Sequence, residues 1–218
     1  MKFLSQQFKK ITARSAGFTL LELLISISIF AFMTAFLVAK YGTFNQGILL
    51  TNLAYDTALT IRSAQSYGLN VQGQASTTAG LAFNYAYGVH FDIDNPTQFI
   101  MFVDLCQDLR YRKFGPPMLL CRNGTTHVNE IISTYTFRKG FSIEHLCLGS
   151  MLDCKPLNTG EGLDVTFKRP SPDAIIQNTA TDIDPAVRHT YAEIGLKATD
   201  GSVKRIIIQS TGQVDIAN

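Results

Sequence analysis

The hydrophobic pattern divides the chain into an apolar run, an amphipathic stretch and a long alternating region. No residue from Leu23 to Ala39 is charged, and the mostly apolar run extends to about 24 residues from Phe18 to Tyr41. A helix of that length is sufficient to cross the hydrocarbon core of a bilayer. Apolar or small residues then recur at intervals of three and four, which predicts one buried helix face formed by Leu50, Leu53, Thr57, Ile61, Ala64 and Gly68.

Gly42 and Gly47 lie between the two helical patterns. Each costs a helix about 1 kcal/mol relative to alanine, so a kink or local melting is expected between them. A helix from Phe18 to Leu69 would be roughly 75 Å long at 1.5 Å per residue.

Beyond residue 70 the pattern predicts strands. The expected strands are Leu81–Phe91, Gln98–Val103, Ile131–Phe137, Ser142–Leu146, Leu163–Lys168, Tyr191–Lys197, Val203–Gln209 and Gln213–Ile216. Asp200-Gly201 and Thr211-Gly212 separate the last three strands, which predicts a C-terminal antiparallel meander. The predicted fold is therefore α+β, with a long N-terminal helix packed on one antiparallel sheet or on a two-sheet head.

The predicted domains follow from these boundaries. They are a basic leader (1–17), a membrane-spanning helix half (18–41), an amphipathic helix half (42–70) and a β-rich globular head (71–218). A length of 218 residues suits one membrane helix and one globular domain.

The charges before the apolar run orient the chain. The first 17 residues contain no acid and four cations, Lys2, Lys9, Lys10 and Arg14, which favours a cytoplasmic N-terminus and an outward C-terminus. A secretory signal is cleaved behind small residues that follow its apolar region, whereas Ser15-Ala16-Gly17 precede the apolar region here. Cleavage after Gly17 would remove the leader and leave Phe18 with a free amine.

Glu22 interrupts the apolar edge of the membrane run. An ionised carboxylate there costs on the order of 2–3 kcal/mol unless a partner offsets the cost. After cleavage the nearest cation is the amine of Phe18, in the same subunit or in a neighbour, and pairing with a neighbour would set the register of a filament. The alternative is that Glu22 only extends to the membrane interface.

This arrangement resembles the class III signal of type IV pilins and of type II secretion pseudopilins. The matching residues are Gly17, Phe18, Thr19-Leu20-Leu21, Glu22 as the fifth mature residue, and Leu23-Leu24-Ile25. The resemblance covers roughly the first 40 residues. It implies cleavage between Gly17 and Phe18 by prepilin peptidase, methylation of Phe18, and assembly through Glu22 and the N-terminal helix. The implied partners are other pilin or pseudopilin subunits, the peptidase and methyltransferase, and an inner-membrane assembly platform.

The C-terminal segment indicates a subgroup within this family. The stretch from Arg205 to Val214 is similar to the end of the H-type minor pseudopilin and its pilus counterpart. Major type IVa pilins usually close a C-terminal loop with a disulfide, but no cysteine follows Cys154 here. The sequence therefore favours a minor pilin or pseudopilin, stored in the inner membrane with its head outside and transferred into a surface or periplasmic filament.

The four cysteines follow the membrane run, on the side where oxidation is expected. Three connectivities are open, and the expected one joins neighbours, Cys106 with Cys121 and Cys147 with Cys154. A metal site of Cys147, Cys154 and His145 is disfavoured because no Cys-x-x-Cys spacing is present. Oxygen ligands for calcium at Asp92, Asp94 and Asn95 are disfavoured by Pro96, and a plain turn is expected there.

A second function class, DNA uptake, would use basic residues of the head. Arg110, Arg112 and Lys113 alternate with Tyr111 and Phe114, and Lys204 and Arg205 form a second pair. Cations and rings together can hold phosphates and stack bases. Loss of the leader changes the formal net charge from +2 to −2, which argues against bulk capture of nucleic acid.

A third class is a single-pass anchored enzyme or receptor with an uncut N-terminus. No catalytic signature with a nucleophile elbow, a zinc helix or a phosphate loop is present, and the four histidines are scattered along the chain. We therefore expect neither catalysis nor a cofactor.

Overall fold

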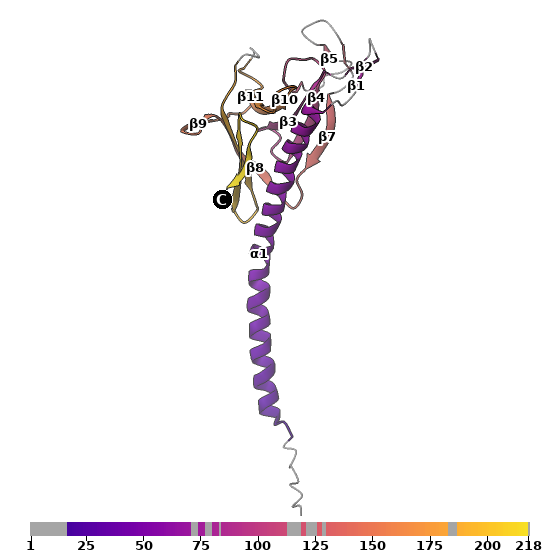
Figure 1. The fold of residues 1–218 in the computed structure, drawn as a ribbon. Helices are drawn as coiled ribbons and strands as arrows, with labels where there is room; N and C mark the ends of the chain where they lie inside the picture. Colours follow the sequence, from indigo (N-terminus) through magenta and orange to yellow (C-terminus); the bar gives the residue numbers. More distant parts are fainter. Residues whose placement is uncertain are drawn as a thin grey trace, which may run out of the picture. The chain divides into compact units, whose positions relative to one another are not determined.

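The computed structural model describes residues 17–70, 74–76, 80–82, 84–112, 119–120, 126–127, 130–182 and 187–217. The chain divides into two compact units, residues 1–42 and 43–218. The first contains the start of a long helix, and the second contains the rest of that helix and the strands (Figure 1).

The helix α1 runs without interruption from Leu20 to Leu69. It begins two residues later than expected, because Thr19 caps it. The expected local melting between Gly42 and Gly47 is wrong, since helical hydrogen bonding continues through both glycines. The helix-forming residues on either side outweigh the cost of two glycines.

The second half of α1 buries the face that the sequence predicts. Leu50, Thr57, Ile61 and Ala64 are almost completely buried, and Gly68 is buried as well. The polar residues between these positions are exposed, namely Asn52, Asp56, Arg62, Ser63 and Ser66. Period-3.6 patterning was therefore sufficient to orient this part of the helix.

The strands form two large antiparallel sheets. The first has the order β11–β10–β3–β4–β7, built from Ala174–Asn178, Gly162–Phe167, Ala86–Asp92, Gln98–Asp104 and Ile131–Thr136. The second has the order β14–β13–β12–β8–β9, built from Val214–Ala217, Val203–Gln209, Tyr191–Lys197, Ser142–Ser150 and Asp153–Pro156. Two short pairs complete the described strands: β1 (Gln74–Ser76) with β2 (Gly80–Ala82), and β5 (Leu119–Leu120) with β6 (Thr126–His127). The α+β class with a two-sheet head is thus confirmed.

One hydrophobic core joins the second half of α1 to both large sheets. Its fully buried members include Ile61 of α1, Phe91 and Phe167 of the first sheet, and Ile194 and Ile206 of the second. Gly68 lies directly against β10, where an added Cβ would be 2.5 Å from the carbonyl oxygen of Phe167. The helix therefore approaches the sheet backbone closely because position 68 has no side chain.

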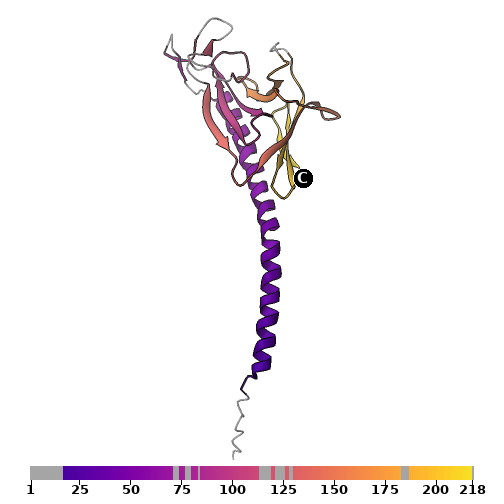
Figure 2. The same cartoon turned by 180° about the vertical axis from the view of Figure 1, so that it is seen from behind.

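The C-terminal meander is confirmed. β12 pairs with β13 and β13 with β14, both antiparallel. Gly201 and Gly212 have φ values of +85° and +83° in the two connecting turns, a conformation that glycine adopts without strain. Figure 2 shows these yellow strands beside the C-terminus.

Several strand boundaries differ from the predictions. The expected strand Leu81–Phe91 is divided between β2 and β3. Sequence patterning missed β9, whose residues Asp-Cys-Lys-Pro are poor strand formers, and β11, which contains only two strongly apolar residues. Both segments are extended because they pair with a neighbouring strand, β9 with β8 and β11 with β10, although their own residues have a low strand propensity.

A disulfide joins Cys147 of β8 to Cys154 of β9, seven residues apart and the pair expected from the sequence. Cys106 is also disulfide-bonded. Its expected partner, Cys121, lies outside the described residues. Residues 93–97 form the expected turn between β3 and β4, and Asp92 accepts hydrogen bonds from the Asp94 N–H and the Asn95 side chain.

Candidate processing and assembly site

The residues expected to be cleaved lie just before α1. Gly17, Phe18 and Thr19 are non-helical and exposed, and Phe18 retains 73% of its accessible surface. No heavy atom outside its chain neighbours lies within 4 Å of a Cβ built on Gly17. The Gly17–Phe18 bond is therefore sterically accessible and lies before the first residue of the helix.

Thr19 fixes the start of the helix. Its Oγ1 accepts a hydrogen bond from the Glu22 N–H at 3.2 Å, and its carbonyl oxygen accepts the Leu23 N–H at 3.1 Å. Thr-x-x-Glu is the sequence of a capping box, and an acidic side chain in the first turn also suits the positive end of the helix dipole. Sequence reasoning assigned Glu22 to assembly and missed this local role of its backbone.

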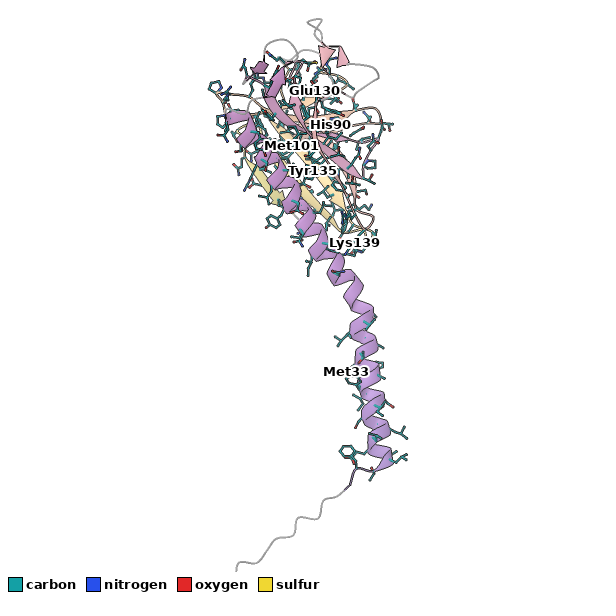
Figure 3. The ribbon with its side chains drawn as sticks, turned by 90° about the vertical axis from the view of Figure 1, so that its right-hand side faces the viewer. Met33, His90, Met101, Glu130, Tyr135 and Lys139 are labelled. Atoms are coloured by element: carbon teal, nitrogen blue, oxygen red, sulfur yellow. A yellow bond between two sulfur atoms is a disulfide. The ribbon has the colours of Figure 1, made fainter. Side chains whose placement is uncertain are left out.

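The first 20 residues of α1, Leu20–Ala39, are mostly apolar on all sides of the helix. One candidate membrane span is present in the described residues, Leu20–Ala39, with a mean hydropathy of 2.3. Its large apolar side chains are exposed on every face, including Met33 in Figure 3. A helix that is apolar all round suits a membrane or a helical bundle rather than water.

The few hydroxyls of this span are satisfied within the helix. Ser26, Ser28 and Thr34 each donate a hydrogen bond to the carbonyl oxygen four residues earlier, at 2.7 to 2.8 Å. A polar group without a partner is costly in hydrocarbon, so these bonds make the span compatible with lipid.

The basic residues considered for DNA binding lie on different elements. Arg110 and Arg112 belong to the 105–112 loop after β4, whereas Lys204 and Arg205 belong to β13 of the other large sheet. Lys113 lies outside the described residues. The arginines of the loop and the basic pair of β13 therefore belong to different parts of the head.

Acidic side chains lie beside two of these cations. Arg112 forms an ion pair with Asp108, with 2.6 Å between Nε and Oδ2, and an Arg205 nitrogen is 3.9 Å from Glu193. The ring of Tyr111 is buried between His90 and Phe102, with centroid distances of 4.5 and 5.6 Å. Pairing and burial leave Arg112 and Tyr111 poorly placed to contact phosphates and bases.

A buried carboxylate cluster holds the 105–112 loop, and sequence reasoning missed it. Glu130 accepts the backbone N–H groups of Leu105, Cys106 and Arg112 at 3.0 to 3.3 Å. Asp104 accepts those of Asp108 and Leu109 at 3.1 and 2.8 Å. Figure 3 marks Glu130 in the head.

Asp164 of β10 is the third carboxylate of the cluster. It is completely buried, accepts the Tyr111 N–H at 3.0 Å and lies 2.8 Å from Nδ1 of His90. Three acids thus bind six backbone N–H groups of the loop, which includes left-handed residues at Gln107 and Leu109. Side-chain acceptors replace the strand partners that this stretch of backbone lacks.

Burial controls the titration of these acids. Desolvation raises the pKa of Glu130 to about 8, with a further contribution from the nearby Asp104. Desolvation also raises the pKa of Asp104 to about 6 and raises that of Asp164. The only sequence signal was an acid in an apolar strand, as at Asp164 between Leu163 and Val165.

The hollow beside this cluster is too small for a substrate. It is lined by His90, Asp92, Asn95, Gln98, Phe99, Ile100 and Tyr111 and has a volume of about 80 Å³, whereas ligand pockets usually span roughly 300–1,000 Å³. Among the described residues, no group of three or more His, Cys, Asp or Glu side chains is placed to hold a metal. The cluster is best explained as a support for the loop.

Comparison with known families supports the N-terminal interpretation. The prokaryotic N-terminal methylation motif matches residues 12–38. No curated protein and no solved structure shows significant similarity to the chain. The chain therefore carries a type IV pilin-like methylation signal, which spans the exposed Gly17–Phe18 bond and most of the apolar start of α1.

Proposed function

We propose that the chain is a structural subunit, a minor pilin or pseudopilin, of a type IV pilus or a type II secretion pseudopilus. The observation that carries this proposal is the methylation motif at residues 12–38, in which an accessible Gly17–Phe18 bond precedes an all-round apolar helix. A motif of this kind indicates a filament subunit rather than an enzyme.

The mechanism follows from the physical properties of α1. Before assembly, the span Leu20–Ala39 is held in the inner membrane with the head outside. Prepilin peptidase removes the leader and the new N-terminus at Phe18 is methylated. The assembly platform then moves the subunit out of the lipid, and neighbouring N-terminal helices replace the lipid contacts of the span.

Mass spectrometry of the N-terminal peptide tests the processing step. Full-length protein from cells that contain prepilin peptidase should begin at N-methylated Phe18, whereas Gly17→Ala should retain Met1. An intact Met1 in both proteins would refute the proposal and return α1 to the status of an ordinary membrane anchor.

Glu22 provides the test of assembly. Because the cap uses the Glu22 N–H, Glu22→Gln should leave the helix start and cleavage intact while removing the charge that pairs with a neighbour's amine. We expect processed but unassembled protein, measured as mature subunits in membranes and their loss from sheared filament fractions. The exposed Asp56→Asn change in the same helix serves as the control, and assembly equal to that control would contradict a role for the Glu22 charge.

A further inference from the structure

The hairpin β8–β9 presents two large apolar side chains to solvent. Met151 and Leu152 form the two-residue connection between Ser150 and Asp153 and are 76% and 99% exposed. Two-residue hairpin loops favour Gly, Asn and Asp, so turn formation does not explain these residues. Two exposed apolar side chains here depart from the local turn preference, and such departures are expected at functional sites.

This hairpin tip, residues Met151 and Leu152, is held rigidly. The Cys147–Cys154 disulfide crosses the hairpin close behind it. Gly149 has a φ of +144°, and an added Cβ would be 2.2 Å from the Asp153 carbonyl oxygen, so the two strands approach closely. A preformed tip loses little entropy on binding.

A complementary hollow lies at the opposite edge of the same sheet. This edge hollow is lined by α1 and β14, through Tyr55, Ala58, Leu59, Arg62, Val214, Asp215 and Ile216, and has a volume of about 230 Å³. A cavity of roughly 150 Å³ can hold a benzene ring, so the hollow can receive a large aliphatic side chain. Tyr55 and Leu59 leave 57% and 56% of their surfaces exposed on its wall.

The charges around the two features also match. Asp153 and Lys155 flank the hairpin tip, whereas Arg62 and Asp215 line the edge hollow. Within the described part of the chain, neither Asp153 nor Lys155 has an ion-pair partner. Arg62 also donates a hydrogen bond to the carbonyl oxygen of Val214 at 3.1 Å. Each side of a contact would therefore bring one acid and one base, and the exposed Lys155 and Asp215 carry opposite charges that can meet.

We propose that the hairpin tip of one copy inserts into the edge hollow of a second copy. β9 and β14 are the two ends of one five-stranded sheet, so the tip and the hollow lie on opposite edges and each copy offers both. A contact between different surfaces of identical subunits is heterologous, and it extends into an open chain unless the rotation closes a ring. The inference names the partner of the head and rests on the proposed role as a filament subunit.

Engineered cysteines test the contact in the full-length protein in its membrane. None of the described cysteines is free. Leu152→Cys combined with Leu59→Cys should form a ladder of dimers, trimers and larger species under mild oxidation, while Met151 preserves the apolar contact. The matched control combines Leu152→Cys with Asp200→Cys, an exposed turn position, and should give no ladder.

Each other pattern of crosslinks has a defined meaning. Dimers formed by Leu152→Cys alone would overturn the proposal in favour of a symmetric tip-to-tip contact. No crosslink in the Leu152→Cys, Leu59→Cys protein would overturn it in favour of a foreign protein or lipid at the tip. The N-terminal mass of the same sample reports processing independently, so a ladder from uncleaved protein would refute the proposed function while supporting the head contact.

Charge reversal provides a second test that a folding defect cannot imitate. Asp215→Lys and Lys155→Glu, two exposed positions, each added singly to the double-cysteine protein, should reduce the crosslinked fraction roughly two- to fivefold, as for exposed ion pairs. The protein with both reversals should recover the ladder. Failure of the double reversal to recover it would contradict the pairing of these two residues.

Discussion

Buried Glu130 should make the stability of the head fall as the pH rises through neutrality. An acid whose pKa is raised by folding holds its proton more tightly in the folded state than in the unfolded state. Its stability contribution is complete below the ordinary value of 4.5 and is lost as the pH rises toward about 8. Ionisation then places a charge in a desolvated site that also lies close to Asp104.

The size of the effect follows from the two pKa values. Between pH 6 and pH 9, a shift from 4.5 to about 8 corresponds to a loss of roughly 2–3 kcal/mol in the free energy of unfolding. Asp104, whose pKa rises only to about 6, loses most of its own contribution below this interval and adds only about 0.4 kcal/mol within it. Asp104 therefore contributes little in this interval, and the comparison with Glu130→Gln separates Glu130 from Asp164, whose pKa is also raised by burial.

Urea unfolding of the full-length protein in detergent, followed by tyrosine fluorescence, measures this loss; the chain contains 8 Tyr and no Trp. Glu130→Gln should flatten the profile between pH 6 and pH 9, although it also weakens the loop by removing one carboxylate oxygen. Glu144→Gln, on an exposed part of β8, should retain the wild-type slope. A wild-type stability that is constant or rises over this interval would refute the reasoning, as would an unchanged slope in Glu130→Gln.

Three further changes test the packing of the head by the same unfolding measurement. Gly68→Ala should destabilise it by about 1–3 kcal/mol, because the new Cβ would overlap the Phe167 carbonyl oxygen; a gain in stability would show that the helix can move away from β10. Gly47→Ala, in the same helix with open space around it, should instead stabilise the helix by about 0.5–1 kcal/mol. Cys147→Ser with Cys154→Ser should cost about 2–3 kcal/mol through the loss of a short closed loop, and an unchanged urea midpoint would show that strand pairing alone holds the hairpin.

The sequence predicted the elements whose determinants are local. The buried face of α1 follows from apolar spacing around Leu50 and Ile61, and the meander follows from Asp200-Gly201 and Gly212 between β-branched runs. β9 and β11 were missed because their strand conformation depends on pairing with β8 and β10. Propensity is a weak guide wherever a partner strand determines the conformation.

In the candidate site, too, local features could be predicted from the sequence and features that depend on the assembled fold could not. The processing signal could be found in the sequence because Gly17, Phe18 and Glu22 are close together in the chain. The acids of the loop cluster could not, because Asp104, Glu130 and Asp164 meet only after β4, β7 and β10 have assembled into one sheet. A single acid in a linear sequence gives no indication that it will bind backbone N–H groups from a distant loop.

The difference between the sequence pattern and the folded head affects where a binding surface should be sought. The basic and aromatic segment at 110–112 looks like a ligand-binding stretch in the sequence, yet the fold uses its backbone, its Tyr111 ring and its Arg112 charge internally. The Met151–Leu152 turn gives no functional signal in the sequence, yet the fold leaves both side chains exposed on a disulfide-braced hairpin. Contacts already satisfied within the head cannot provide binding energy to a partner without first being broken, whereas exposed apolar surface on a rigid support can. We therefore propose this hairpin, rather than Tyr111 and Arg112, as the place on the head where a partner binds.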